Sequence, residues 1–283
     1  MILPALLCAA TAVATSCGGG ASKETADAQE MIDEAKLLIE SRQYDSSIVI
    51  LDSLCKKYPK EIDIVKVAMN LKAATLEKSF MQQLAQADSV IASNAPAVQE
   101  ISGKFKVVKT PEMVEGYRVI KSIAGTPLLN RTAIEPRIDD GGNLYIVSLL
   151  HGKSIQHDHL KVAASGAGSA VTASVPYDKA RNYRFNDDGI SNEMVTFHFD
   201  ECENFCRFIA ENSDKNITLT FVGKSSYSMP MPADVKRAIA DSYRYSAAIR
   251  DGLNAEKTKL MLQKKLEIAK KQIERTKIED SSK

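Results

Sequence analysis

The chain has 283 residues, of which 44% are hydrophobic and 26% are charged. This length and apolar content suffice for two domains of ordinary size with packed cores. The formal net charge of +1 at pH 7 gives no electrostatic reason to expect a nucleic-acid partner. The absence of tryptophan weighs against a site that binds sugars by stacking on aromatic rings.

Residues 1–17 predict a lipid-modified bacterial export signal. An apolar run from Ile2 to Val13 leads into small residues and Cys17, and three glycines follow directly. A run of about a dozen apolar residues suits a signal peptide and is too short to span a bilayer. We therefore expect Cys17 to carry a diacylglycerol and to become the first residue of the mature protein, with residues 18–24 as a flexible tether.

The start of this segment departs from the usual pattern. Signals of this kind normally open with Lys or Arg, and Met1 to Leu7 contains neither. Two alternatives follow: a start codon upstream of this methionine, or a frayed apolar N-terminus of a cytosolic protein. If Cys17 is acylated, the other cysteines after the signal are Cys55, Cys202 and Cys206, so at least one thiol cannot pair and no disulfide framework is expected.

Residues 25–95 have the periodicity of helices. Two helices are expected before Pro59, joined by a polar turn at residues 41–45, and a second pair is expected over residues 63–76 and 80–93, ended by Asn94-Ala95-Pro96. The first hairpin resembles a tetratricopeptide repeat in Ala35, Tyr44-Asp45, Ile48, Leu51 and Tyr58-Pro59. The following stretch does not repeat this pattern, and an array needs three or more units. The sequence thus predicts one repeat-like hairpin plus further helices.

Residues 104–232 predict a β domain. Strands are expected at residues 105–108, 144–149, 171–175, 195–199 and 217–221, with turns at the Asp139-Asp140 and Asp187-Asp188 pairs. Asp200 is expected to cap a short helix that extends to Asn212. The fold class is therefore α+β, with an antiparallel β-sandwich or strongly curved sheet that carries one helical insertion.

Residues 233–280 predict a long C-terminal helix, with Gly252 as a kink or break. Leu262, Leu266, Ala269 and Ile273 recur at the spacing of a helical seam, and residues 255–279 hold eight basic and four acidic side chains. Three interpretations remain open: packing on the N-terminal helices, a homodimeric coiled coil through residues 255–279, or attraction to anionic lipid or cell wall.

No motif predicts a catalytic site or a cofactor. His151, His157 and His159 are weak candidates for a metal site, because a His-x-His pair on a strand places both rings on one side. No glutamate follows at the spacing of cupin-like sites, so a solvated strand face or turn is the preferred interpretation. His198 is expected at the surface. Cys202 and Cys206 share an apolar helix face with Phe205 and Ile209, which predicts buried structural thiols.

The aspartate pairs and the segment at residues 165–169 are expected to be turns and a hairpin loop. Adjacent aspartates on a strand point to opposite faces, and the glycine-rich segment lacks the lysine and following helix of a phosphate loop.

Several short segments along the chain, together with the hairpin residues above, form a recognisable set: Leu51-Asp52-Ser53-Leu54, Asp88-Ser89, Val114-Glu115-Gly116-Tyr117, Val175-Pro176-Tyr177-Asp178, Asn182-Tyr183-Arg184-Phe185 and Ala269-Lys270-Lys271-Gln272-Ile273. In these segments the whole mature chain resembles a group of functionally uncharacterised lipoproteins of Bacteroides-type bacteria. The resemblance implies N-terminal helices, a β domain and a C-terminal helix, and it implies no activity.

From these observations we expect an outer-membrane lipoprotein that binds a protein partner as a scaffold, with the membrane contacted through its lipid anchor. Its orientation, periplasmic or at the cell surface, is left open. The alternatives are an envelope enzyme that acts on polysaccharide or peptidoglycan, and a self-assembling structural lipoprotein.

Overall fold

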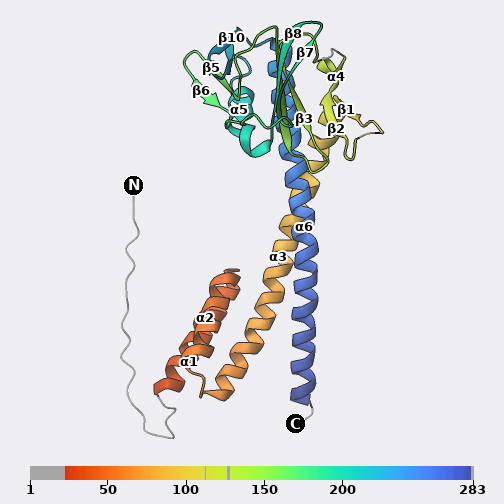
Figure 1. The fold of residues 1–283 in the computed structure, drawn as a ribbon. Helices are drawn as coiled ribbons and strands as arrows, with labels where there is room; N and C mark the ends of the chain where they lie inside the picture. The colour runs from red at the N-terminus through yellow and green to blue at the C-terminus, as the bar shows by residue number, and fades with distance from the viewer. Residues whose placement is uncertain (1–22, 112, 126–127, 282–283) are drawn as a thin grey trace, which may run out of the picture. The chain divides into compact units, whose positions relative to one another are not determined.

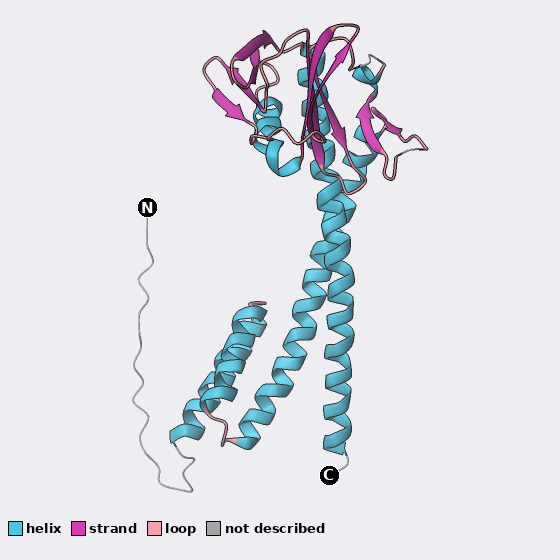
Figure 2. Cartoon of the chain, viewed as in Figure 1, coloured by secondary structure: helices cyan, strands magenta, loops and turns pink. Residues whose placement is uncertain are grey.

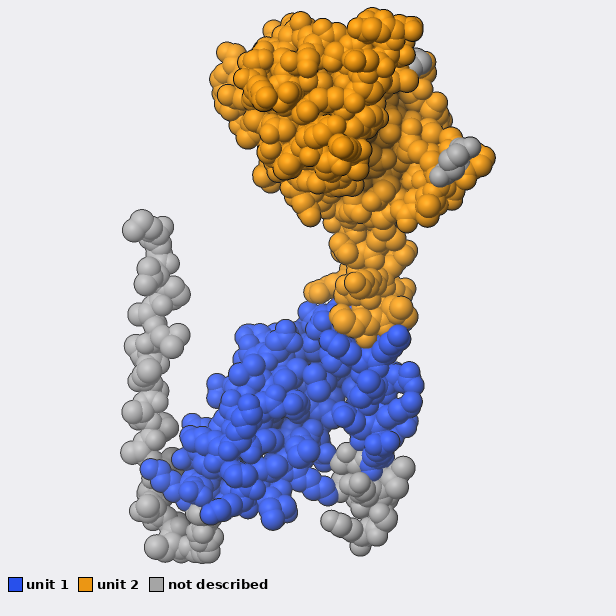
Figure 3. Space-filling model, in the orientation of Figure 1, with its two compact units in different colours: residues 1–83, 262–283 blue, residues 84–261 orange. Residues whose placement is uncertain are grey.

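The computed structural model describes residues 23–111, 113–125 and 128–281 (Figure 1). It confirms the α+β class: N-terminal helices, two antiparallel sheets and a long C-terminal helix. The chain divides into two compact units, which Figure 3 colours separately. We call residues 1–83 and 262–283 the helical unit, and residues 84–261 the sheet unit.

The helical unit begins with a hairpin of two helices, α1 (Lys23–Glu40) and α2 (Tyr44–Lys57). Its turn contains Arg42 with a φ of 59°, and Ser47 donates a hydrogen bond of 3.0 Å to the carbonyl of Ala35 across the pair. The helices and the start of α3 enclose a small core of their own, formed by Ala28, Ile32, Ala35, Leu51, Leu54, Tyr58 and Ala68. The predicted first hairpin is therefore confirmed.

The predicted second hairpin is wrong. A single helix, α3 (Ile62–Ser102), runs through Lys78 and includes Pro96 in its interior. A proline inside a helix removes one backbone hydrogen bond and costs about 3 kcal/mol, so local sequence alone favours a break there. The helix gains burial that the local sequence does not reveal, because the C-terminal helix packs along it.

This C-terminal helix, α6 (Ala233–Ser281), is also continuous, so the chain does not break at Gly252. In the helical unit, the seam residues Leu262 and Ala269 are 1% and 3% exposed, and Lys265 Nζ lies 5.9 Å from the centroid of the Phe80 ring on α3. In the sheet unit, Lys259 Nζ lies 2.6 Å from Asp88 Oδ1 of α3. Of the three interpretations of the seam, the structure shows packing on the N-terminal helices.

Two antiparallel sheets make up the body of the sheet unit (Figure 2). Their strands are β1 (Phe105–Val108), β2 (Tyr117–Ile120), β3 (Ala133–Ile138), β4 (Leu144–His151), β5 (His159–Ala164), β6 (Gly168–Val171), β7 (Asn182–Asp187), β8 (Ile190–Phe197), β9 (Ile217–Val222) and β10 (Ser226–Pro230). The first sheet has the order β1-β2-β3-β4-β8-β7 and the second β10-β9-β5-β6. The chain leaves the first sheet after β4 and enters the second at β5, through residues 152–158, which we call the crossover.

The largest core of the chain's described part lies in this unit. Both sheets contribute to it, and so do α5 (Phe199–Glu211) and the first turns of α6, with Leu150, Leu160, Phe197, Phe205, Phe221, Val235 and Ile239 among its members. A four-residue helix, α4 (Lys121–Ala124), follows β2. The N-cap of α5 is His198 and not Asp200: the His198 backbone N–H donates to Glu201 Oε2 at 2.7 Å, which closes a capping box.

The strands differ in part from expectation. The strand predicted over residues 171–175 is displaced, since β6 ends at Val171 and residues 172–178 form no strand. The Asp187-Asp188 turn is confirmed: Asp188 and Gly189 both have positive φ, as a two-residue hairpin turn of type I′ requires. Pro136 sits inside β3, where its missing N–H is tolerated because β2 pairs with β3 only between Arg118 and Ile138.

Candidate functional site

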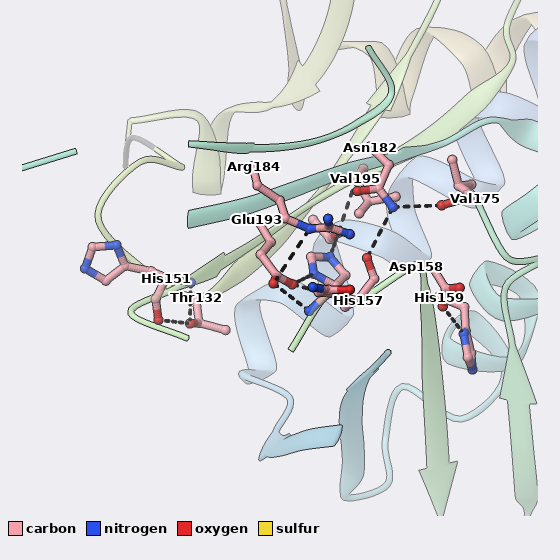
Figure 4. A network of polar contacts seen from close by, with 12 residues as sticks. Thr132, His151, His157, Asp158, His159, Val175, Asn182, Arg184, Glu193 and Val195 are labelled. Atoms are coloured by element: carbon pink, nitrogen blue, oxygen red, sulfur yellow. Dashed lines mark hydrogen bonds and ion pairs between the residues drawn. The ribbon is translucent and has the colours of Figure 1, made fainter. Parts of the chain in front are cut away.

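A buried polar network surrounds His157 on the crossover (Figure 4). The His157 Nε2 atom lies 2.9 Å from Ser148 Oγ of β4. On the other side of the ring, His157 Nδ1 lies 2.9 Å from Glu193 Oε2 of β8. A hydroxyl, an imidazole and a carboxylate thus form a hydrogen-bonded chain, in the order in which a nucleophile, a base and an orienting acid stand in many hydrolases.

The Glu193 carboxylate makes four of the contacts in this network. Its Oε1 atom accepts a hydrogen bond of 2.6 Å from the Gln156 backbone N–H, and Oε2 accepts one of 2.8 Å from the His157 backbone N–H. Arg184 Nε lies 4.0 Å from Oε1. Burial works to raise the pKa of the Glu193 carboxyl, but the hydrogen bonds from the His157 ring and from the two backbone N–H groups outweigh it and lower the pKa below its ordinary value. The carboxyl is therefore ionised at neutral pH.

The contact with Glu193 also fixes which ring nitrogen of His157 carries a proton. Because the Glu193 carboxylate accepts only, His157 Nδ1 carries a proton and donates it. The Ser148 hydroxyl has a single proton and two acceptors within reach, the His157 Nε2 atom at 2.9 Å and the Val195 carbonyl at 3.2 Å. When the hydroxyl donates to His157 Nε2, both nitrogens of the ring have a partner.

Solvent does not reach the three reactive groups. Ser148, His157 and Glu193 are each 0% exposed, and the Phe221 ring lies edge-on to His157 with centroids 5.4 Å apart. A catalytic nucleophile has to meet its substrate, and this serine is enclosed on every side. The arrangement has the connectivity of a catalytic triad without the access that catalysis requires.

The geometry instead shows a clamp on the crossover. Asn182 of β7 donates from Nδ2 to the carbonyls of Val175, at 2.8 Å, and His157, at 3.3 Å. In addition, the Lys224 backbone N–H donates to the Ile155 carbonyl at 2.8 Å. A Cβ atom on Gly223 would stand 2.4 Å from the Gln156 carbonyl oxygen, so only glycine permits this approach. The network fixes the segment that joins the two sheets.

The three candidate metal ligands do not converge. His151 and His159 lie on opposite sides of His157 in Figure 4. His151 Nδ1 pairs with Asn192 Oδ1 at 2.8 Å, and His159 Nδ1 pairs with Asp158 Oδ1 at 2.6 Å. Among the residues that the structure describes, no group of three His, Cys, Asp or Glu side chains could hold a metal ion.

The preferred interpretation of these histidines as a solvated face is wrong for His157. This residue precedes β5 instead of sharing its face with His159, and it is wholly buried because Glu193 and Ser148 satisfy its ring. His198 is exposed, as expected.

The cysteines take the places that the sequence predicts. Cys202 and Cys206 are both 0% exposed on the inner face of α5, with Phe205 and Ile209. Burial and the neighbouring Cys202 thiol raise the pKa of Cys206 well above its ordinary value, so this thiol stays protonated. Cys55 on α2 is half-buried, and burial, followed by the nearby Asp52, raises its pKa as well. The predicted lipidation site, Cys17, lies outside the described residues.

The helical unit leaves large apolar side chains in solvent. Leu37 of α1 is 67% exposed and Val49 of α2 is 64% exposed, while Val67 and Met69 of α3 are 51% and 60% exposed. Single exposed apolar residues are ordinary. Here, however, they occur on α1, α2 and α3 of a unit whose own core consists of few residues.

Comparison of the chain with protein-family models, with curated protein sequences and with solved structures finds no significant match. No helix of the described residues is both long and apolar enough to cross a membrane.

Proposed function

We propose that this protein is an exported lipoprotein, tethered to the outer membrane through Cys17, that acts as a binding or scaffolding module in the cell envelope. The anchor is inferred from the apolar run, the small residues and Cys17 at the start of the chain. The binding role is supported by one structural observation, the exposed apolar side chains Leu37, Val49, Val67 and Met69 of the helical unit. Exposed apolar side chains on this unit would favour association with a protein partner, because burying them in an interface is favourable.

The same structure does not favour the alternative of an envelope enzyme. Within the described residues, the one hydroxyl–imidazole–carboxylate chain is closed to solvent. The self-assembly alternative relied on the predicted seam, but the seam residues Leu262 and Ala269 are already buried within the single chain and are not available to a second copy. A homodimer through residues 255–279 would have to use the exposed Leu260, Met261 and Ile268 instead.

Position-specific photo-crosslinking in intact cells tests the binding role. A photoreactive amino acid at Val67, which is 51% exposed on α3, is expected to give a discrete crosslinked species with one partner. The matched control carries the same amino acid at Glu256, an exposed polar position of α6 in the sheet unit, and is expected to give none. Identical products from both positions, or none from Val67, would contradict the proposal.

A further inference from the structure

A cavity of about 350 Å³ opens in the sheet unit, beside the first turns of α6. Its walls come from three places: the loop between α3 and β1, the junction of β2 with α4, and one face of α6. The lining residues are Lys104, Ile120, Lys121, Ser122, Asp234, Arg237, Ala238 and Asp241. The volume lies at the lower end of the range for small-molecule sites, which is about 300–1,000 Å³.

The charges of this cavity are only partly satisfied by the protein. Lys104 Nζ pairs with Asp241 Oδ2 at 3.0 Å, and Lys121 Nζ donates to the Gly103 carbonyl at 2.7 Å. Arg237 and Asp234 are exposed and form no ion pair with any residue in the described ranges, although they are three positions apart on one helix, a spacing that normally allows pairing. One guanidinium and one carboxylate therefore remain available in the same cavity.

The balance of donors and acceptors indicates the ligand chemistry. An unused guanidinium offers five N–H donors in a planar fork that matches a carboxylate or phosphate, and each lysine ammonium keeps further donors beyond the bond it makes. Asp234 accepts hydrogen bonds only, which suits an ammonium group. Ile120 and Ala238 are 5% and 0% exposed and provide an apolar floor for a short carbon chain.

We propose that this cavity binds a small zwitterion, in which a carboxylate or phosphate contacts Arg237 and Lys121, and an ammonium group contacts Asp234. The volume suits a ligand of about the size of an amino acid or of phosphoethanolamine. This site lies in the sheet unit and is independent of the docking role proposed for the helical unit. A ligand of this size binds in the millimolar range, because few atoms contribute to its affinity.

Calorimetric titration of the full chain with defined probes tests this site. L-alanine represents the carboxylate class and phosphoethanolamine the phosphate class, as in a lipid headgroup. Acetate and ethylamine each carry only one of the two charges. At least one zwitterion is expected to bind in the millimolar range, with acetate and ethylamine each about tenfold weaker. The preferred zwitterion distinguishes the two ligand sources. Binding of neither zwitterion, or equal binding of acetate, would overturn the proposal.

Two surface variants assign the contacts. Arg237→Gln and Asp234→Asn are each expected to lower the affinity for the zwitterion about tenfold, because each removes one charged partner. Arg207→Gln and Asp214→Asn are the matched controls, since both residues are exposed and lie outside the cavity. Added salt is expected to weaken binding to the unaltered chain through screening. Unchanged affinity in Arg237→Gln, with its fold confirmed by circular dichroism, would exclude the site.

Discussion

Replacing Glu193 is the most direct test of whether the buried network holds the crossover in place. The Glu193 carboxylate accepts three hydrogen bonds shorter than 3.0 Å: from the Gln156 backbone N–H, the His157 backbone N–H and the His157 ring. Glu193→Gln keeps the shape of the side chain but replaces one accepting oxygen by a donating NH₂ group. At least one buried N–H then faces another donor, and the remaining bonds lose their ionic character.

The expected cost follows from these contacts. A hydrogen bond to a charged group contributes about 1.5–3 kcal/mol, and a buried donor left without an acceptor costs about 1–3 kcal/mol. We expect Glu193→Gln to lower the free energy of unfolding of the sheet unit by about 3 kcal/mol. Glu256→Gln, at an exposed position of α6, is the control and is expected to change it by less than about 0.5 kcal/mol.

Urea unfolding followed by near-ultraviolet circular dichroism measures this difference, since the chain has nine tyrosines and no tryptophan. Hydrogen exchange with mass spectrometry then localises it, and the peptide that covers residues 152–158 is expected to lose the most protection. If Glu193→Gln matched the control in both measurements, the network would not hold the crossover, and the interpretation of the site as a clamp would be wrong.

Three further predictions follow from the same contacts. The pKa of Glu193 is lowered in the folded state, so its ionised carboxylate stabilises the fold fully above the pKa of the unfolded chain, about 4.3. This stabilisation is lost as the pH falls through the lower pKa of the folded chain. In acid titration, Glu193→Gln is expected to lack this pH-dependent loss of stability. Gly223→Ala is expected to destabilise the sheet unit by more than about 3 kcal/mol in thermal unfolding, because the added Cβ meets the Gln156 carbonyl, and a midpoint equal to that of the unaltered chain would disprove the close approach. Leu262→Ala is expected to lower the free energy of unfolding in urea by about 2–5 kcal/mol, because Leu262 is buried. Leu260→Ala, at an exposed position nearby, is expected to lower it by less than about 0.5 kcal/mol. Equal effects of the two substitutions would show that the seam does not pack on α3.

Periodicity predicted the elements that bury one clear face. The first hairpin, the inner face of α5 with Cys202 and Cys206, and the α6 seam were all visible as apolar residues at helical spacing. The helix end predicted at Asn94-Ala95-Pro96 was wrong because Pro96 is a local signal for a break, while the burial that sustains α3 comes from α6, far away in the sequence. Strands such as β3, which contains Pro136, gave no alternating pattern.

The buried network was only half visible in the sequence. The His157-x-His159 pair stood out, but the partners of His157 lie on strands β4 and β8, with Glu193 36 positions beyond His157. One available signal was missed. Glu193, Val195 and Phe197 are two positions apart along β8 and therefore lie on the same face of the strand. Extending the predicted apolar face two residues toward the N-terminus would have placed the Glu193 carboxylate among buried side chains. A carboxylate in that position requires strong donors, and histidine with backbone N–H groups supplies them.

The central claim, that a lipid on Cys17 tethers this binding module to the envelope, is tested most directly by mass spectrometry of the N-terminal peptide from native protein. The account predicts a mature chain that begins at Cys17 and carries diacylglycerol, and a Cys17→Ser chain that leaves the membrane fraction. An unmodified thiol at residue 17, or a Cys17→Ser chain that fractionates as the unaltered protein does, would contradict it.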